Sequence, residues 1–392
     1  MDIIKGAKSI GLVTLLALSL AVAPTVLSGS LTSVQIPSNP KPITYVHAQE
    51  EHSGEEAYLR FVSDIVQQQS TNNTNTNTTT IQIPETAKGP AIPSEKGYLV
   101  QEIGDQLYSV SDGSYNTMFM VTDEGVIAVD APPTLGANYL KAIAEVTDKP
   151  TTHVIYSHAH MDHIGAARIF PENATFVAQQ ETASELQRAM NMATNTSMVP
   201  PVPTETFSKN MTLKVGNQTL QLDYYGNNHL PGNIFIYAPQ QKVLMLVDII
   251  FPGWIPFPYL AIAKDTAGFI EAHDIALNNY DFDTIVAGHL TRLGTKADIG
   301  VQREFVMDLE KAADNANQNV SFSGIASQVG SFDNPWLLFS KYIDAINKQC
   351  EEVMLPKWES KLGGAEIFMS THCFTMTESG RVDPTIQALF QD

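Results

Sequence analysis

Basic residues are scarce in this chain of 392 residues, and their scarcity narrows the range of partners. Lys and Arg number 23 against 42 Asp and Glu, which leaves a formal net charge of −19. A surface of this charge repels phosphate backbones, so it argues against nucleic acid as a substrate or partner. It also disfavours a strongly anionic small substrate, and the C-terminal part of the sequence shows no basic cluster suited to phosphate or glutathione.

Cysteine is nearly absent as well, since Cys350 and Cys373 are the only two. Neither lies near the histidine-rich segment described below, so thiolate ligands are not expected there. In an oxidising compartment the two cysteines could pair and clamp the last helix to the C-terminal segment. Two separately buried thiols are the alternative, and the sequence leaves both open.

The first 96 residues are expected to lie outside the folded domain. Two lysines precede a continuous apolar run from Ile10 to about Leu27, which is typical of a signal peptide or signal anchor over residues 1–30. Residues 31–96 are typical of a disordered polar tether, because their Gln, Asn and Thr-rich tract cannot bury enough apolar surface to offset its ordering entropy. We therefore expect an exported protein, either secreted or anchored to the outer face of the cell membrane through this segment.

Three histidines and an aspartate fall within six positions: His158, His160, Asp162 and His163. A β-branched and aromatic stretch of strand length, 152–157, precedes them, so they occupy a loop that follows a strand. His158 and His160 are two apart on extended chain and point the same way. Asp162 and His163 follow where the chain turns, so they can face a second point and one loop can serve two metal ions. Imidazole and carboxylate ligands without thiolates favour zinc and hydrolytic chemistry.

The pattern His158-x-His160-x-Asp162-His163 resembles the signature of the metallo-β-lactamase superfamily. The resemblance covers about residues 97–300 and implies an α+β fold, the αβ/βα four-layer sandwich, in which two sheets pack together with helices outside. Short strand-like runs separated by Gly- and Asp-containing turns agree with this fold. Residues 97–300 would then form the catalytic domain, and the helical patterns over 301–392 a C-terminal helical extension.

The resemblance implies three further metal ligands, each placed near the end of a strand. His229, in the turn Gly226–Asn233, resembles the third ligand of the first metal. Asp248 resembles the carboxylate that bridges both metals, and His289 resembles the last ligand of the second metal. Two Zn²⁺ ions are the implied cofactors, with Fe or Mn as alternatives. Asp130 resembles a buried acid beneath the metal loop, although an aspartate that initiates a turn before proline is a compatible interpretation.

The implied chemistry is hydrolysis in which two divalent ions lower the pKa of a shared water and polarise the scissile carbonyl. Asp248 and Asp162 are the implied catalytic residues, because Asp248 would hold the ions together while Asp162 would orient the bridging hydroxide. The loop after Asp248 is rich in proline and aromatic residues. In this loop Trp254, Phe257 and Tyr259 could form the apolar wall of a substrate pocket. Packing of the loop on the C-terminal helices is the alternative.

The residue at position 248 also indicates the class of substrate. True metallo-β-lactamases generally carry Cys or Ser at the matching position, whereas lactonase-like and glyoxalase II-like members carry Asp, as this chain does at Asp248. The chain is therefore expected to cleave a small ester or lactone, with side activity on β-lactams. The alternatives are a thioester hydrolase of the glyoxalase II type, a true β-lactamase, a mononuclear iron persulfide dioxygenase, and an exported protein that is only structural or stores metal. The expected partner is a small-molecule substrate, and the sequence leaves the oligomeric state open.

Overall fold

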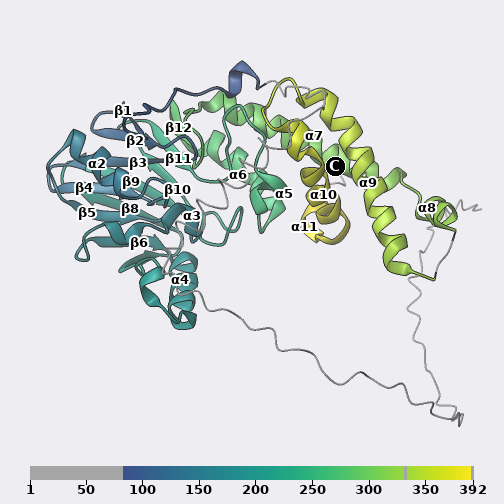
Figure 1. Cartoon of the computed structure of the whole chain (residues 1–392), viewed down its shortest axis with the longest axis horizontal. Coiled ribbons are helices and arrows are strands. Elements are labelled where there is room, and N and C mark those ends of the chain that lie inside the picture. Colours follow the sequence, from purple (N-terminus) through teal and green to yellow (C-terminus); the bar gives the residue numbers. More distant parts are fainter. Residues whose placement is uncertain (1–82, 331–332, 390–392) are drawn as a thin grey trace, which may run out of the picture. The chain divides into compact units, whose positions relative to one another are not determined.

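Two mixed β-sheets form the centre of the fold, and helices cover the outer face of each (Figure 1). The computed structural model describes residues 83–330 and 333–389. The expected signal segment, and the tether up to residue 82, lie outside these residues. Within the described ranges, no helix combines the length and the apolar character needed to cross a membrane.

The first sheet has seven strands in chain order and changes from antiparallel to parallel pairing at β4 and β5. Its first four strands form an antiparallel meander, as the short strand-like runs separated by Gly- and Asp-containing turns predict. In the turn before β3, the Asp112 carboxylate accepts hydrogen bonds from the backbone N–H groups of Ser114 and Tyr115. The strands are β1 (Leu99–Gly104), β2 (Leu107–Ser111), β3 (Asn116–Thr122), β4 (Gly125–Val129), β5 (Thr151–Ile155), β6 (Thr175–Gln179) and β7 (Glu205–Phe207).

The second sheet has five strands in the order β12-β11-β10-β9-β8. Its pairs are antiparallel except for β11 and β12, which run parallel. The carboxyl ends of β11 and β12 therefore meet at one edge, where residues that follow them can lie close together. The strands are β8 (Asn210–Val215), β9 (Gln218–Asp223), β10 (Phe235–Ala238), β11 (Val243–Leu246) and β12 (Thr284–Val286).

The two sheets pack face to face through aliphatic and methionine side chains. Along β11, Val243 and Met245 belong to the core between the sheets, whereas Leu244 and Leu246 belong to the core beneath the helices. This alternation follows from the strand geometry, which points successive side chains to opposite faces. Each fully buried side chain of this kind contributes about 1.5–3 kcal/mol. The order of layers is helix, sheet, sheet, helix, so the predicted four-layer α+β sandwich is confirmed.

The helical elements before residue 280 have at most 14 residues each. Tyr139 and Ile143 of α2 and Leu186 of α4 are buried against the first sheet. The helical elements before residue 280 also include α6, which packs in the core next to the second sheet. These elements are η1 (Glu85–Ala87), α2 (Ala137–Val146), α3 (Met161–Ile164), η2 (Ala167–Ile169), α4 (Gln180–Met192), η3 (Thr196–Met198), α5 (Pro258–Ile262) and α6 (Thr266–Asn279).

The C-terminal helices pack on one another and on α6, next to the second sheet. They are α7 (Lys296–Asn319), α8 (Phe322–Val329), α9 (Pro335–Trp358), α10 (Ala365–Val382) and α11 (Pro384–Leu389). Trp358 is fully buried, and its ring meets the edge of the Phe305 ring at 5.4 Å between centroids. The last strand ends at Val286 and α7 begins at Lys296, so helices follow the sheets as expected, while the exact domain boundaries stay a prediction.

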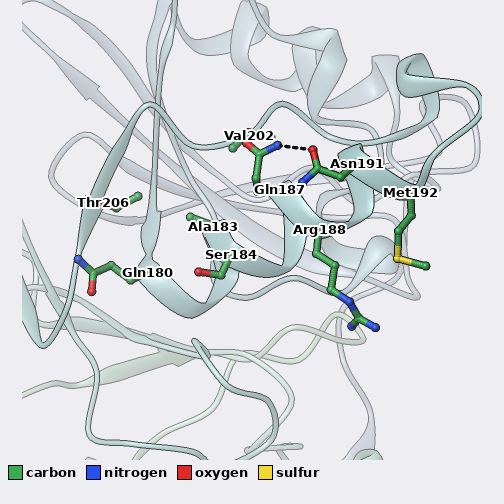
Figure 2. A pocket seen from close by; sticks show the side chains of 9 residues that line it. All are labelled: Gln180, Ala183, Ser184, Gln187, Arg188, Asn191, Met192, Val202 and Thr206. Carbon is green, nitrogen blue, oxygen red and sulfur yellow. Dashed lines mark hydrogen bonds between the residues drawn. The ribbon is translucent and has the colours of Figure 1, made fainter.

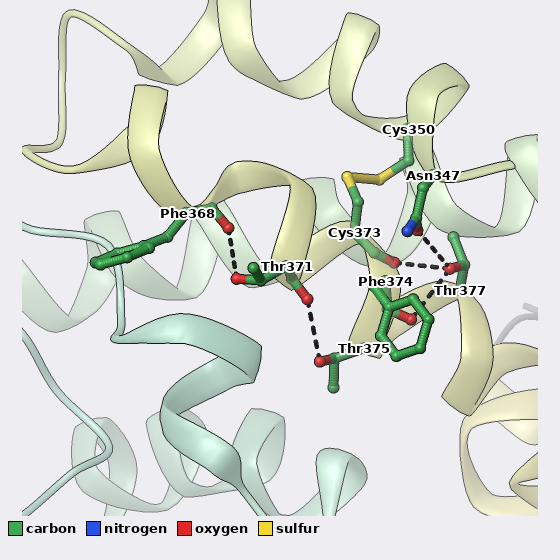
Figure 3. Close-up of a disulfide and its surroundings, with 8 residues drawn as sticks. All are labelled: Asn347, Cys350, Phe368, Thr371, Cys373, Phe374, Thr375 and Thr377. Carbon is green, nitrogen blue, oxygen red and sulfur yellow. Dashed lines mark hydrogen bonds between the residues drawn. A yellow bond between two sulfur atoms is a disulfide. The ribbon is translucent and has the colours of Figure 1, made fainter. Parts of the chain in front are cut away.

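A disulfide joins Cys350 of α9 to Cys373 of α10 (Figure 3). Of the two alternatives that the sequence left open, the structure thus shows the paired one. Beside the bridge, the Thr377 hydroxyl donates to the Asn347 side chain and to the Cys373 carbonyl. The bridge closes a loop with a sequence separation of 23, and in the chain-entropy account a loop of this size is worth about 3 kcal/mol.

The spacing of five apolar residues in the sequence predicts one stripe along α9, and this stripe is only partly buried; the five are Phe339, Tyr342, Ile346, Cys350 and Val353. Ile346 and Cys350 are buried as predicted, but Phe339 and Val353 are 38% and 57% exposed. Leu338, Ile343 and Met354 take the buried positions in their place, together with Trp358. Apolar residues occur on more than one face of this helix, so periodicity alone could not decide which stripe is buried. Pro356 does not end the helix, which continues to Trp358.

The short element α5 has a left-handed backbone. Tyr259, Leu260, Ala261 and Ile262 have φ angles of 60°, 53°, 54° and 54°. For residues with a side chain this conformation costs about 1–2 kcal/mol each, and it normally occurs at single positions. Four consecutive residues in this region therefore require support from the surrounding structure.

Candidate metal centre

The histidine-rich loop connects β5 to α3, as the sequence predicted, and the neighbouring strand β4 holds both of its ends. Asp130 follows β4 with a φ of 53°, and its Oδ1 atom accepts a hydrogen bond of 2.7 Å from the Ser157 N–H. The next residue, Ala131, donates its N–H to the His163 carbonyl at 2.7 Å. Asp130 is fully buried, so its predicted position beneath the metal loop is confirmed.

The ligand candidates assemble into two groups that come from four separate segments of the chain. In each group the candidate ligand atoms lie within 4.8 Å of one another. His158 and His160 share the first group and Asp162 and His163 the second, which is the division expected from strand alternation. The first group is His158, His160, His229 and Asp248, and the second is Asp162, His163 and His289.

Asp248 lies between the two groups. Its Oδ2 atom is 3.2 Å from the Nε2 atom of His229 in the first group and 3.2 Å from that of His163 in the second. Its Oδ1 atom is 2.9 Å from the Nε2 atom of His289. Asp248 has a φ of 61°, a conformation that aspartate tolerates better than most residues. One buried carboxylate thus faces both groups, which suits a bridging ligand.

The buried histidine nitrogens indicate that these residues fit a metal. The Nε2 atoms of His158 and His163 are buried and make no hydrogen bond of good geometry among the described residues, although the Asp248 Oδ2 atom lies 3.5 and 3.2 Å from them. Buried polar atoms normally have partners, and an ion is one explanation when they do not. Five imidazoles and two carboxylates without a thiolate form a donor set suited to zinc and similar divalent cations. The residues therefore fit a divalent metal at each group.

The pKa shifts in the centre agree with this interpretation. Burial, reinforced by the nearby imidazoles of His163 and His229, lowers the pKa of His158 well below its usual value, and burial lowers that of His160 to about 4. Their lone pairs are therefore free to bind a cation. Burial opposes the charged form of His163, but the Asp248 carboxylate outweighs it and raises the pKa of His163 to about 9. A divalent cation between these two side chains would displace that proton.

Hydrogen bonds outside the ligand set orient the imidazoles. The Nδ1 atom of His289 donates to the Ser114 carbonyl at 3.2 Å, which leaves its Nε2 atom to face Asp248. The Nδ1 atom of His158 is also hydrogen-bonded, since it lies 3.0 Å from the Ser157 hydroxyl. Such partners select the tautomer and hold the ring in place.

Two asparagines connect the His229 turn to the end of β11. The Asn228 side-chain oxygen accepts hydrogen bonds from the His229 N–H at 2.6 Å and from the Asn233 amide at 3.1 Å. The Asn233 amide also donates to the Val247 carbonyl at 3.0 Å, one residue before Asp248. His229, before the start of β10, and Asp248, after the end of β11, are therefore held at a fixed separation at the same end of this strand pair.

Tyr115 is a site residue that the sequence did not reveal. Its hydroxyl lies 3.3 Å from the Asp162 Oδ2 atom, and its ring contacts the rings of His163 and His289, at 5.4 and 4.8 Å between centroids. In the sequence it is an aromatic residue at the start of an expected strand. Its partner Asp162 is 47 residues away in the sequence, so no local pattern indicates that the two side chains lie side by side.

The three aromatic residues expected to line the substrate pocket have different surroundings. The Phe257 ring meets the His289 ring edge-on at 4.6 Å, and Phe257 is 39% exposed. Tyr259 is exposed and contacts Phe374 of α10. The Trp254 indole instead packs on Gly363 and donates to the Ala87 carbonyl at 2.8 Å. Trp254 thus fits the packing alternative, while a substrate-binding role for Phe257 and Tyr259 stays a prediction.

A cavity of about 690 Å³ lies along α4, and none of its lining residues belongs to the histidine loop (Figure 2). Amide, hydroxyl and apolar side chains line it with one guanidinium, and none of them is a candidate metal ligand. Inside it the Gln187 amide donates to the Asn191 carbonyl oxygen at 3.0 Å. The lining residues are Gln180, Ala183, Ser184, Gln187, Arg188, Asn191, Met192, Val202 and Thr206. This set provides no acid–base pair or ligand cluster, so the chemistry is assigned to the metal centre.

Comparisons with known proteins agree with the geometry. The 2,4-dinitroanisole O-demethylase subunit alpha of Nocardioides sp. (strain JS1661) is 28% identical over 229 residues, which cover 56% of this chain and 64% of that protein. The metallo-beta-lactamase type 2 of Elizabethkingia meningoseptica is 24% identical over 203 residues, 48% of this chain and 78% of the lactamase. The chain therefore spans less than two thirds of the length of the first of these relatives.

A solved structure shows the same fold. The stereoselective inverting sec-alkylsulfatase Pisa1 from Pseudomonas sp. aligns with a TM-score of 0.51 and 17% identity, over 75% of this chain and 52% of that one. Residues 110–289 match the model of the metallo-beta-lactamase superfamily, and this stretch contains all seven candidate ligands. The metallo-β-lactamase superfamily predicted from the sequence is thus the family that this part of the chain matches, and its members are mostly metal-dependent hydrolases.

Proposed function

We propose that the protein is an exported hydrolase with a dinuclear zinc centre, and that its substrate is a small ester, preferably a lactone. The observation that carries this proposal is the arrangement of two ligand groups around the single carboxylate of Asp248. Three histidines face one side of it, and two histidines and an aspartate face the other. A protein that only stored metal would have no need of a shared carboxylate between two groups, one of which reaches solvent.

The side chains of the metal centre have different roles in the proposed ester hydrolysis. Two divalent cations at these groups would supply Lewis acidity for a carbonyl oxygen and lower the pKa of a water molecule. Asp248 is buried, so it holds charge but has little access to incoming water. The Asp162 side chain is 46% exposed, so its Oδ2 atom can accept a proton from a water molecule that enters the site. The Tyr115 hydroxyl, 3.3 Å from this oxygen, orients it.

A neutral ester with an apolar acyl group suits the surroundings of the centre. Phe257 places an exposed aromatic ring against the His289 imidazole, where it can contact an acyl chain and exclude water. The net charge of −19 disfavours anionic glutathione thioesters. An aspartate at position 248, rather than the Cys or Ser expected of a true β-lactamase, favours the lactonase-like branch.

Cleavage of an aryl methyl ether is a second candidate function. The 2,4-dinitroanisole O-demethylase subunit alpha shares 28% identity with this chain over 229 residues. Ether and ester cleavage both release an oxygen leaving group, which the same cationic site would stabilise. The chain covers only 64% of that relative, so the ether is ranked below the lactone.

A substrate panel tests the reaction. We expect the zinc-loaded full chain to show its highest kcat/KM on lactones, with lower values on β-lactams, glutathione thioesters and persulfides. Chelation should remove turnover and added zinc should restore it, because the ligands hold the only Lewis acids proposed. His160→Ala, which removes one ligand, should lower kcat/KM by at least about 100-fold while the circular dichroism spectrum stays native.

The same panel separates the candidates. If 2,4-dinitroanisole were cleaved faster than every lactone, the second candidate would replace the first. A β-lactam or a glutathione thioester with the highest kcat/KM would show that the substrate class is wrong. Persulfide oxidation with iron, without ester turnover, would assign the dioxygenase chemistry instead.

Phe257 and Trp254 form a matched pair for testing the pocket wall. Phe257→Ala should reduce the preference for long over short acyl lactones by about 10-fold, because the ring beside His289 is lost. Trp254→Ala should leave that preference unchanged and lower stability by up to about 3 kcal/mol, because its indole packs on Gly363. The acyl-chain preference and guanidinium unfolding of both variants provide the measurement. Equal effects of the two variants on the preference would contradict this assignment.

Export is the third part of the proposal. The apolar N-terminal run and the pairing of Cys350 with Cys373 both support an oxidising compartment. In cells whose thiols are trapped with an alkylating agent before lysis, we expect the protein outside the cytoplasm with neither cysteine labelled. Recovery of unprocessed protein only from the soluble cytosol, with both thiols alkylated, would refute export.

A further inference from the structure

The segment 249–265 touches the metal centre at three points. It begins directly after Asp248, and in its middle the Phe257 ring lies against the His289 ring at 4.6 Å. It ends where the Lys264 N–H donates to the His229 carbonyl at 2.8 Å. We call 249–265 the metal-centre loop. Because it contacts three ligands, its conformation affects both the centre and the apolar surface beside it.

This loop contains the left-handed turn Tyr259–Ile262, which is unfavourable by itself. One hydrogen bond within the turn, from the Ala261 N–H to the Phe257 carbonyl, is 2.8 Å long. Another joins the Ala263 N–H to the Leu260 carbonyl at 3.1 Å. A right-handed turn would make bonds of the same kind without the steric cost, so these bonds do not explain the handedness.

Hydrogen bonds from side chains of α10 support the left-handed turn. The His372 Nδ1 atom accepts a hydrogen bond of 3.1 Å from the Leu260 N–H, and its Nε2 atom donates to the Pro256 carbonyl at 3.1 Å. The neighbouring Thr371 hydroxyl accepts from the Tyr259 N–H at 3.2 Å. One imidazole therefore bonds to the backbone on both sides of Phe257, before the turn and within it.

The chemistry of His372 suits this fixed role. It is fully buried, and its ring meets the edge of the Phe305 ring at 5.9 Å between centroids. A ring that accepts at Nδ1 and donates at Nε2 must be neutral and in one tautomer. Burial lowers the pKa of His372 to about 3, which keeps it in that form.

The beginning of the metal-centre loop is held in a similar way by α7. The Gln302 side chain accepts a hydrogen bond of 2.7 Å from the Phe251 N–H and donates to the Ile249 carbonyl. Its amide also bonds to the Nε2 atom of buried His273 at 2.9 Å. Buried polar side chains of the helical layer thus fix the loop at two places, near its beginning and around Phe257.

We propose that His372 is a positioning residue, through which the C-terminal helices set the place of Phe257 beside the metal centre and so the acyl-chain preference of the enzyme. This inference rests on the proposed esterase function for its effect on substrates. Its structural part, that His372 holds the left-handed turn, is independent of the substrate. The two parts can therefore fail separately.

The test compares three variants of the full zinc-loaded chain. His372→Phe keeps a ring of similar size against Phe305 but removes both hydrogen bonds, whereas His372→Gln keeps an acceptor and a donor. Thr377→Val, on the same helix, removes the bonds of a buried hydroxyl to Asn347 and Cys373 without touching the loop. It therefore controls for a general loss of stability in α10.

Hydrogen–deuterium exchange of peptides that cover 256–263 provides the readout that needs no substrate. We expect exchange there to become at least about 10-fold faster in His372→Phe, to recover partly in His372→Gln, and to stay unchanged in Thr377→Val. Metal content should stay the same in all three. Unchanged exchange in His372→Phe, or equal acceleration in Thr377→Val, would overturn the structural part.

The kinetic readout tests the effect on specificity. The ratio of kcat/KM for long against short acyl substrates should fall about fivefold or more in His372→Phe, mainly through KM of the long substrate, and recover in part in His372→Gln. An unchanged ratio with accelerated exchange would show that the loop does not select the acyl chain. If no ester were turned over by the wild type, the proposed function would fail, while the exchange result would still decide the role of His372.

Discussion

The buried carboxylate of Asp248 is the constraint on which the rest of the structure depends. It is 4% exposed and faces histidine nitrogens of both ligand groups at 2.9 to 3.5 Å. An anion in such a place is tolerated only when positive charge compensates its lost hydration. Without a metal, protonated His163 provides this compensation, and its pKa is raised to about 9 accordingly. With divalent ions in both groups, the same carboxylate would be held from both sides.

The fold satisfies this constraint by bringing strand ends together. β5 leads into the histidine loop, while β11 and β12, which run parallel, bring Asp248 and His289 to one edge of the second sheet. Close approach there requires a glycine at position 288, since a Cβ atom would lie 2.5 Å from a Val247 methyl group and 2.8 Å from the His163 ring. Burial of the aliphatic core between the sheets stabilises the fold, and this offsets the cost of the buried charge and the left-handed backbone at the site.

Much of the metal centre could be predicted from the sequence, because four of its candidate ligands lie within six consecutive positions. Strand alternation divided His158 and His160 from Asp162 and His163, and the structure places them in separate groups. His229, Asp248 and His289 required the family resemblance, since a single histidine or aspartate at a strand end has no distinctive spacing. The four-layer sandwich followed from the same resemblance together with the pattern of short strands and turns.

Other features could not be predicted, because they depend on contacts between distant segments. Tyr115 meets Asp162 only after the first sheet has formed, and His372 meets Pro256 only after α10 has packed. The left-handed turn carries no glycine or asparagine that would mark it in the sequence. Trp254 was expected beside a substrate with two other aromatic residues, yet a neighbouring glycine, Gly363, offers its indole a closer packing surface.

The central claim is that one carboxylate would bridge two metal ions, and anomalous diffraction tests this proposal most directly. Data would be collected above and below the zinc absorption edge from crystals of the zinc-loaded protein. The account predicts two peaks of similar height, about 3.5–4 Å apart, one on each side of the Asp248 carboxylate. A single peak, or two peaks of which only one contacts Asp248, would contradict it.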